Sequence, residues 1–142
     1  MDERKLRLTF DSDFKNVDIA RAAIGGICRE LSGSSAPESL VFDFSLAVTE
    51  AMNNAVEHSG AKSIEIEIVL TKGEILFRMF TEGDKYEPAK TASMPILDDD
   101  NQVEGGFGLA IIQELVDKVD YEYLDNKNVL TLKKTFSAND KE

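Results

Sequence analysis

Residues 49–60 read TEAMNNAVEHSG and form the centre of the chain's longest helical pattern. The two adjacent asparagines, Asn53 and Asn54, are unusual there, because the asparagine amide competes for backbone hydrogen bonds and disfavours helix. Glu50 comes four residues before Asn54, so the two side chains share one face of a helix. A carboxylate and an amide oxygen on one face indicate a site, although the same spacing is common on solvent-facing helix surfaces.

This helix face has the groups for phosphate chemistry. Mg²⁺ takes hard oxygen ligands and keeps several waters, so Asn54 could offer it one ligand. Glu50 could then accept a proton from an attacking hydroxyl group or water. His58 lies near the helix end, where the helix dipole favours an imidazolium. We expect His58 to pack or to cap the helix and not to catalyse.

A second motif, EGGFGLAII at residues 104–112, places three glycines before or at the start of a predicted helix. Glycine lets the backbone approach a ligand closely, and the free N–H groups of a helix start attract phosphate. The glycines follow a long loop and not a strand, which excludes the dinucleotide-binding fingerprint, and no Lys-Ser or Lys-Thr pair follows, which excludes a P-loop. A flexible turn into a helix is the alternative interpretation.

Hydrophobic spacing predicts a strand, two helices, a strand hairpin, a long loop, a helix and a second hairpin. The predicted elements cover residues 4–10 (strand), 15–32 and 38–58 (helices), 62–70 and 74–80 (strands), 107–119 (helix), and 120–125 and 128–136 (strands). Paired antiparallel strands, with helices free to cover one face, predict an α+β fold. We expect a two-layer α/β sandwich with a mixed, mostly antiparallel sheet.

Composition and charge exclude several classes of protein. The 142 residues fit a single domain, 1–142, with a tail over 137–142 that we expect to fray. The formal net charge of −11 argues against nucleic acid and against an anionic membrane surface. The single cysteine, Cys28, cannot form an internal disulfide or a cysteine metal cluster. The charged start does not read as a signal peptide, and no apolar run is long enough for a membrane helix, so we expect a cytoplasmic protein.

With both motifs in this order, the chain resembles the GHKL (Bergerat-fold) ATPase superfamily, which includes gyrase and the histidine kinases. Within it, the chain looks like the small bacterial anti-sigma-factor serine/threonine kinases. SLAVTEAMNNAVEHSG, residues 45–60, is similar to that family's N-box, and GGFGLAII, residues 105–112, to its second glycine box. The resemblance covers nearly the whole chain and implies the same two-layer fold.

The resemblance implies a role for each matching residue. Glu50 would be the catalytic base, and Asn54 would bind a Mg²⁺ ion that bridges the phosphates of ATP. Asn53 would line the pocket, and residues 88–104 would form a lid over the nucleotide. The other nucleotide-binding candidates are Thr81, Gly83, Gly105, Gly106, Gly108, Leu109 and Thr131. The last of these matches a threonine that family members often place near adenine.

The first glycine box departs from the family pattern and reads TEGDKYEP over residues 81–88. Thr81 stands where the family has an aspartate that accepts a hydrogen bond from the adenine amino group. A threonine hydroxyl is shorter and uncharged, and charge-assisted hydrogen bonds are the stronger kind, so nucleotide affinity could fall substantially. Glu82 and Asp84 are the nearest carboxylates, but strand alternation points Glu82 to the opposite face.

Three classes of function are consistent with these features. The first is an enzyme that binds Mg-ATP and phosphorylates a serine or threonine of a partner, which in the family is an anti-sigma-factor antagonist of the STAS type. The second, favoured by Thr81, is a binding module that sequesters a sigma factor or another regulator and binds nucleotide weakly or not at all. A general ATP hydrolase of the gyrase type ranks below both, because no transducer domain is expected here. Family members commonly dimerise, so a homodimer is a further candidate, beside ATP and ADP as ligands.

Overall fold

The computed structural model describes residues 3–32, 38–71, 73–85 and 107–135. Within these ranges lie β1 (Arg4–Asp11), α1 (Phe14–Ser32), α2 (Glu38–His58), β2 (Ser63–Thr71), β3 (Glu74–Glu82), α3 (Phe107–Leu115), β4 (Lys118–Leu124) and β5 (Lys127–Thr135). The predicted order of helices and strands is confirmed, whereas the predicted lid and the tail lie outside the described residues. No described helix combines the length and the apolar composition that crossing a membrane requires.

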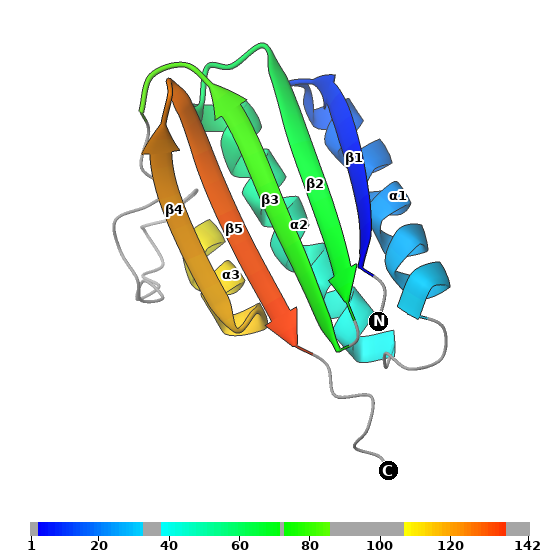
Figure 1. The fold of residues 1–142 in the computed structure, drawn as a ribbon. Helices are drawn as coiled ribbons and strands as arrows, with labels where there is room; N and C mark the ends of the chain where they lie inside the picture. Colours follow the sequence, from blue (N-terminus) through cyan, green and yellow to red (C-terminus); the bar gives the residue numbers. More distant parts are fainter. Residues whose placement is uncertain (1–2, 33–37, 72, 86–106, 136–142) are drawn as a thin grey trace, which may run out of the picture.

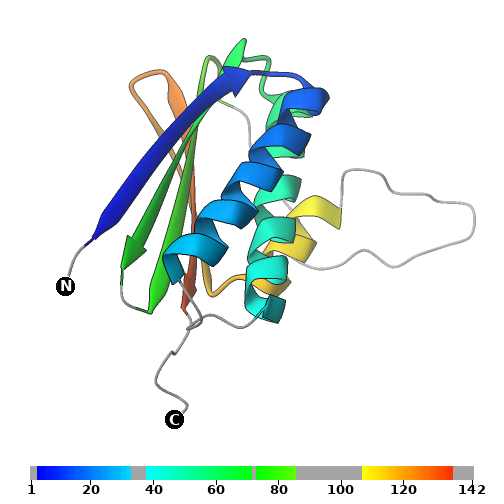
Figure 2. The same cartoon turned by 90° about the vertical axis from the view of Figure 1, so that its right-hand side faces the viewer.

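The five strands form one sheet in the order β1-β2-β3-β5-β4, and each neighbouring pair is antiparallel. The three helices all lie on one side of this sheet (Figure 2). α2 lies in the middle of the helix layer and contacts α1 on one side and α3 on the other (Figure 1). The expected two-layer α+β sandwich is therefore confirmed, and the described strands include no parallel pair.

The core lies between the sheet and the helices, because both layers present an apolar face. Buried residues recur every three or four positions over residues 41–55 of α2. On β3, every second residue from 75 to 81 is buried. The two elements meet where the ring of Phe44 packs edge-on against Phe77, with ring centroids 6.5 Å apart and planes at 84°.

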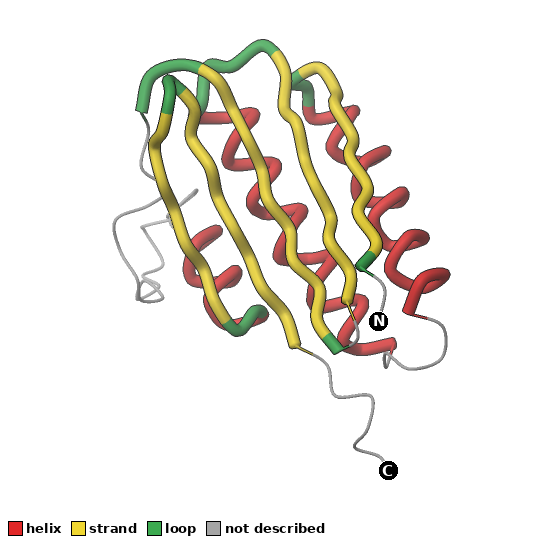
Figure 3. Tube along the Cα trace, in the orientation of Figure 1, coloured by secondary structure: helices red, strands yellow, loops and turns green. Residues whose placement is uncertain are grey.

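Turn residues fix the two hairpins. Gly73 has a φ of +89° at the predicted β2–β3 turn, a value that favours glycine. Asp125 and Asn126 have φ values of +53° and +65°, the pair of left-handed residues that a tight hairpin turn requires. The β4–β5 turn lies at the same end of the sheet as the end of β3, because Glu82 at the end of β3 pairs with Lys127 at the start of β5 (Figure 3).

The helix predicted over residues 107–119 is shorter than expected. α3 ends at Leu115, and the Asp117 N–H already bonds the carbonyl of Lys133 in β5 (2.8 Å). The Asp117 carboxylate in turn accepts a hydrogen bond from the N–H of Thr135 (2.6 Å). Pairing with the sheet therefore overrides the apolar helical spacing, which continues past Leu115 in the sequence.

Candidate functional site

Thr81 and Gly83 of the predicted site lie where β3 finishes, at one end of the sheet, and α2, which carries three other predicted site residues, ends at the same end (Figure 1). β3 and β4 finish at this end, β5 begins there, and the α2–β2 connection lies beside them (Figure 3). α3 lies behind the opposite half of β4 and β5 (Figure 1). We call this region, where β3 and β4 finish and β5 begins, the site end of the sheet.

Glu50 and Asn54 lie on the flank of α2 that is turned away from α1. Ser45 lines a groove against α1. Since a helix turns about 100° per residue, Glu50 and Asn54 lie roughly 140° and 180° around α2 from Ser45. That is the side on which α3 contacts α2. Asn53 lies about 100° around the helix from Asn54, so it does not share this flank, although all three predicted site residues of α2 are half-buried.

The carboxylate of Glu50 is suited to accept a proton. Burial raises the pKa of its carboxyl group above the ordinary value. Within the described part of the chain, no hydrogen bond or ion pair engages this carboxylate. Glu57, further along α2, is exposed, and its carboxylate lies 3.7 Å from Nε2 of His58. His58 is itself about half exposed at the last position of α2, so it does not pack into the core.

Thr81 is a buried polar residue close to the end of β3. Its side chain is 1% exposed and lies on the helix-facing side, in the same alternation as Phe77 and Met79. Among the described residues, its Oγ1 is the buried side-chain polar atom that lacks a hydrogen-bond partner. Leaving such a hydroxyl unsatisfied costs about 1–3 kcal/mol. Because most buried polar atoms do have a partner, this exception indicates a place for a ligand.

Asn128 is a site-end residue that the sequence analysis missed. It pairs with Thr81 across β3 and β5, on the same face of the sheet, and is 2% exposed. Its Oδ1 accepts a hydrogen bond from the Tyr121 hydroxyl, and its Nδ2 donates to the Asp84 carbonyl (3.0 Å). The alternation of β5 could have identified it, because Asn128 comes two residues before the buried Leu130.

Thr131, expected near adenine, lies on the other face of the sheet. The β3–β5 register pairs it with Arg78, whose guanidinium bonds Glu67 on the side that no described helix covers. Side chains alternate along a strand, so Thr131 and Asn128, three positions apart, point to opposite faces. The assignment of Thr131 to the adenine site is therefore corrected, since the sheet separates it from Thr81.

Gly83 lies where the chain leaves β3. Its φ of +137° is a value that side chains rarely allow, which explains a glycine at this point. Its N–H donates to the Asn126 carbonyl (2.9 Å), and its own carbonyl accepts from the Tyr123 hydroxyl (2.8 Å). The β4–β5 hairpin therefore holds the chain in place as it leaves the sheet.

The second glycine motif is only partly described. Gly108 and Leu109 lie in the first turn of α3, where the backbone is described, whereas Gly105 and Gly106 lie outside the described residues. The first N–H groups of a helix have no partner within the helix. The expected contact with phosphate depends on this feature of α3.

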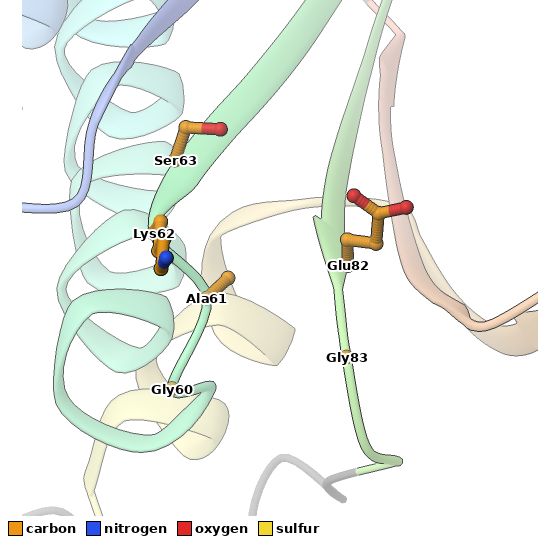
Figure 4. A pocket seen from close by; sticks show the side chains of 6 residues that line it. All are labelled: Gly60, Ala61, Lys62, Ser63, Glu82 and Gly83. Carbon is orange, nitrogen blue, oxygen red and sulfur yellow. The ribbon is translucent and has the colours of Figure 1, made fainter.

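A pocket of about 300 Å³ opens beside these residues, between the α2–β2 connection and the end of β3 (Figure 4). It is lined by Gly60, Ala61, Lys62, Ser63, Glu82 and Gly83. The pocket shares Gly83 with the predicted site, but Glu50, Asn54 and Thr81 do not line it. It is therefore separate from the flank of α2 on which the chemistry is expected.

The residues present fit a Mg-nucleotide. Asn54 offers an amide oxygen, and Mg²⁺ in nucleotide sites takes only one or two protein ligands beside substrate phosphates and water. Within the described ranges, no cluster of three or more His, Cys, Asp or Glu side chains could hold a metal ion on its own. A metal held largely by phosphates needs no such cluster, and the Thr81 hydroxyl adds a buried atom with an unmet hydrogen bond.

Comparison with known proteins decides the family. The family model of the histidine kinase-like ATPase domain matches residues 10–134. The chain belongs to this family. Serine-protein kinase RsbW of Staphylococcus epidermidis is 30% identical over 125 residues, which cover 81% of this chain and 76% of that protein. Serine-protein kinase RsbW of Staphylococcus aureus (strain Newman) is 31% identical over 113 residues, which cover 72% of this chain and 69% of that protein.

The fold of this histidine kinase-like ATPase domain also matches a solved structure. The crystal structure of the RsbU and RsbW domains of a Mycobacterium tuberculosis protein aligns with a TM-score of 0.68 at 20% sequence identity. The match covers 94% of this chain and 32% of the other, so this chain spans about a third of that protein. The resemblance to the GHKL superfamily that the two sequence motifs indicated is confirmed.

Proposed function

We propose that this protein is an anti-sigma factor and a protein kinase of a partner-switching pathway. It binds Mg-ATP and transfers the γ-phosphate to a serine or threonine of an anti-sigma-factor antagonist with a STAS-type fold. The observation that carries the proposal is the flank of α2, where the half-buried Glu50, with its raised pKa, lies one turn before Asn54. The similarity to two proteins named serine-protein kinases supports the same reaction.

Residues of α2, of the end of β3 and of the start of α3 have separate parts in this reaction. Glu50 accepts the proton of the attacking serine or threonine hydroxyl. Asn54 holds Mg²⁺, which, when bound, neutralises charge that develops on the phosphates. Thr81 and Gly83 contact the purine base of the nucleotide, and the glycine-containing start of α3 contacts the phosphates. Little covalent chemistry is asked of the protein, because phosphoryl transfer depends mainly on positioning and electrostatics.

Transfer of labelled phosphate from ATP to a purified STAS-type antagonist tests the proposal. The Glu50→Gln variant removes the proton acceptor and keeps the shape, so the transfer rate should fall by roughly 10²–10⁴-fold. Glu57→Gln is the matched control, because Glu57 lies on the same helix but is exposed, and it should transfer at the wild-type rate. A Glu50→Gln variant that transfers as fast as the wild type would refute the assigned base.

A second function is favoured by one observation. Thr81 presents an uncharged hydroxyl where the anti-sigma-factor kinases that the chain resembles have a carboxylate. The second function is therefore to sequester a sigma factor with weak binding of nucleotide. Titration with ATP and ADP separates the two functions. Absence of heat with either nucleotide, together with retained capture of a sigma factor, would favour the sequestering module.

A further inference from the structure

We propose that the site accepts guanine as well as adenine nucleotides, and that Thr81 sets this tolerance. The inference rests on the proposed function, because it concerns the base of the nucleotide bound at the site end. Thr81 supplies its hydroxyl to that base. Thr81 is then a specificity-determining residue and not only a weaker hydrogen-bond acceptor in place of a carboxylate.

The Thr81 hydroxyl is available for hydrogen bonds with a ligand. Its Oγ1 is buried and unpartnered within the described part of the chain, on the helix-facing side. The group beside it is committed elsewhere, since the Asn128 amide bonds the Asp84 carbonyl and the Tyr121 hydroxyl. Gly83 is likewise held by Asn126 and Tyr123. These contacts keep the end of β3 in place and leave the Thr81 hydroxyl as the adaptable group.

A hydroxyl can pair with either kind of hydrogen-bonding group. A carboxylate only accepts hydrogen bonds, whereas a threonine hydroxyl rotates to donate one or to accept two. At position 6 of the purine ring, adenine presents an amino donor and guanine presents a carbonyl acceptor. A carboxylate satisfies the first and repels the second. The Thr81 hydroxyl accepts from the adenine amino group or donates to the guanine oxygen by rotating about one bond.

The acidic residues next to Thr81 in the sequence do not restore a fixed acceptor. Glu82 is exposed, and the alternation of β3 places it on the opposite face from Thr81. Asp84 is also exposed, and the contact that it makes toward Asn128 uses its backbone carbonyl. Neither Glu82 nor Asp84 therefore replaces a buried carboxylate beside Thr81, because both are exposed whereas Thr81 is buried.

The consequence is a loss of discrimination. A site with a fixed hydrogen-bonding group rejects a ligand that cannot pair with it by as much as about 10⁴–10⁵-fold. With a hydroxyl in that place, either purine can pair at position 6, through hydrogen bonds of similar strength. We therefore expect the two dissociation constants to agree within about tenfold. Both affinities should be lower than a carboxylate would give adenine.

Calorimetric titration of the full chain with Mg-ATP and with Mg-GTP tests the inference. Thr81→Ser keeps the hydroxyl and should keep the ratio of the two dissociation constants. Thr81→Val removes the hydroxyl and should weaken both nucleotides. Thr81→Asp restores a fixed acceptor and should shift the ratio toward ATP by at least about 100-fold. If the buried carboxylate of Thr81→Asp prevents folding, the serine and valine variants still decide the question.

Two results would overturn the inference while leaving the proposed function in place. One is a wild-type protein that binds Mg-ATP at least about 100-fold more tightly than Mg-GTP, a ratio that requires a fixed acceptor. The other is a Thr81→Val variant with unchanged affinity for both nucleotides, since the hydroxyl would then not contact the base. Absence of binding to either nucleotide would overturn both the inference and the proposed function.

Discussion

Replacing Thr81 by valine should stabilise the free protein, although Thr81 belongs to the proposed binding site. Valine keeps the shape of threonine and exchanges the hydroxyl for a methyl group. The buried Oγ1 has no partner among the described residues, and leaving a hydroxyl in that state costs about 1–3 kcal/mol. Its removal should therefore raise the free energy of unfolding by about 1–2 kcal/mol. For a domain of this size, the corresponding rise in Tm is roughly 3–8 °C.

Urea denaturation followed by circular dichroism measures this change, with an unaltered slope against urea showing that the unfolding transition is the same. Thr49→Val is the matched control, because the Thr49 hydroxyl is half-buried but satisfied, donating to the Ser45 carbonyl (2.7 Å). That variant should lose about 0.5–1.5 kcal/mol. If Thr81→Val instead lost 1 kcal/mol or more, its hydroxyl would have a partner in the free protein. The interpretation of Thr81 as a place kept for a ligand would then be wrong.

Two further predictions concern the backbone at the site end and the bare face of the sheet, which is the face that no described helix covers. Gly83→Ala should lower the free energy of unfolding by roughly 1–3 kcal/mol, because the φ of +137° at this position strains any side chain. Gly26→Ala in α1 is the control and should raise the free energy of unfolding by about 0.5–1 kcal/mol, because a Cβ there meets open space. Similar changes for the two variants in chemical denaturation would contradict this prediction. Burial alone would raise the pKa of the Glu67 carboxyl, but hydrogen bonds from Arg7 and Arg78 outweigh it and lower the pKa below the ordinary 4.5. The stabilisation that Glu67 gives is therefore present above pH 4.5 and lost as the pH falls through the lowered native value. Glu67→Gln should flatten the acid limb of the plot of stability against pH, and a limb parallel to the wild type would show that Glu67 does not cause it.

The bounds of α1 and α2 and, to within two residues, those of the strands could be predicted because they depend on local spacing. The apolar period of α2 lies within its own residues, and so does the four-residue spacing that puts Glu50 and Asn54 on one flank. The Asp125-Asn126 turn likewise needs only its own two left-handed residues. Such features require no knowledge of which element packs against which.

What the sequence analysis missed depends on pairing between distant residues. The register of β5 against β3 places Asn128, and not Thr131, beside Thr81. This register cannot be derived from the sequence of β5 alone, and Thr131 was therefore assigned to the adenine site. Glu67 is buried on the bare face because Arg7 and Arg78 cover it, and these lie 60 and 11 positions away in the chain.

Calorimetric titration of Mg-ATP into the wild type and into Asn54→Ala tests most directly whether the Glu50–Asn54 flank of α2 holds the nucleotide. The wild type should bind with a micromolar Kd, about −8 kcal/mol, and should need Mg²⁺ to do so. Asn54→Ala should bind at least about tenfold more weakly, about 1.4 kcal/mol, and should lose most of the dependence on Mg²⁺, while Glu57→Gln behaves as the wild type. Absence of heat from the wild type, or an Asn54→Ala variant that binds Mg-ATP as tightly as the wild type, would contradict the proposed site.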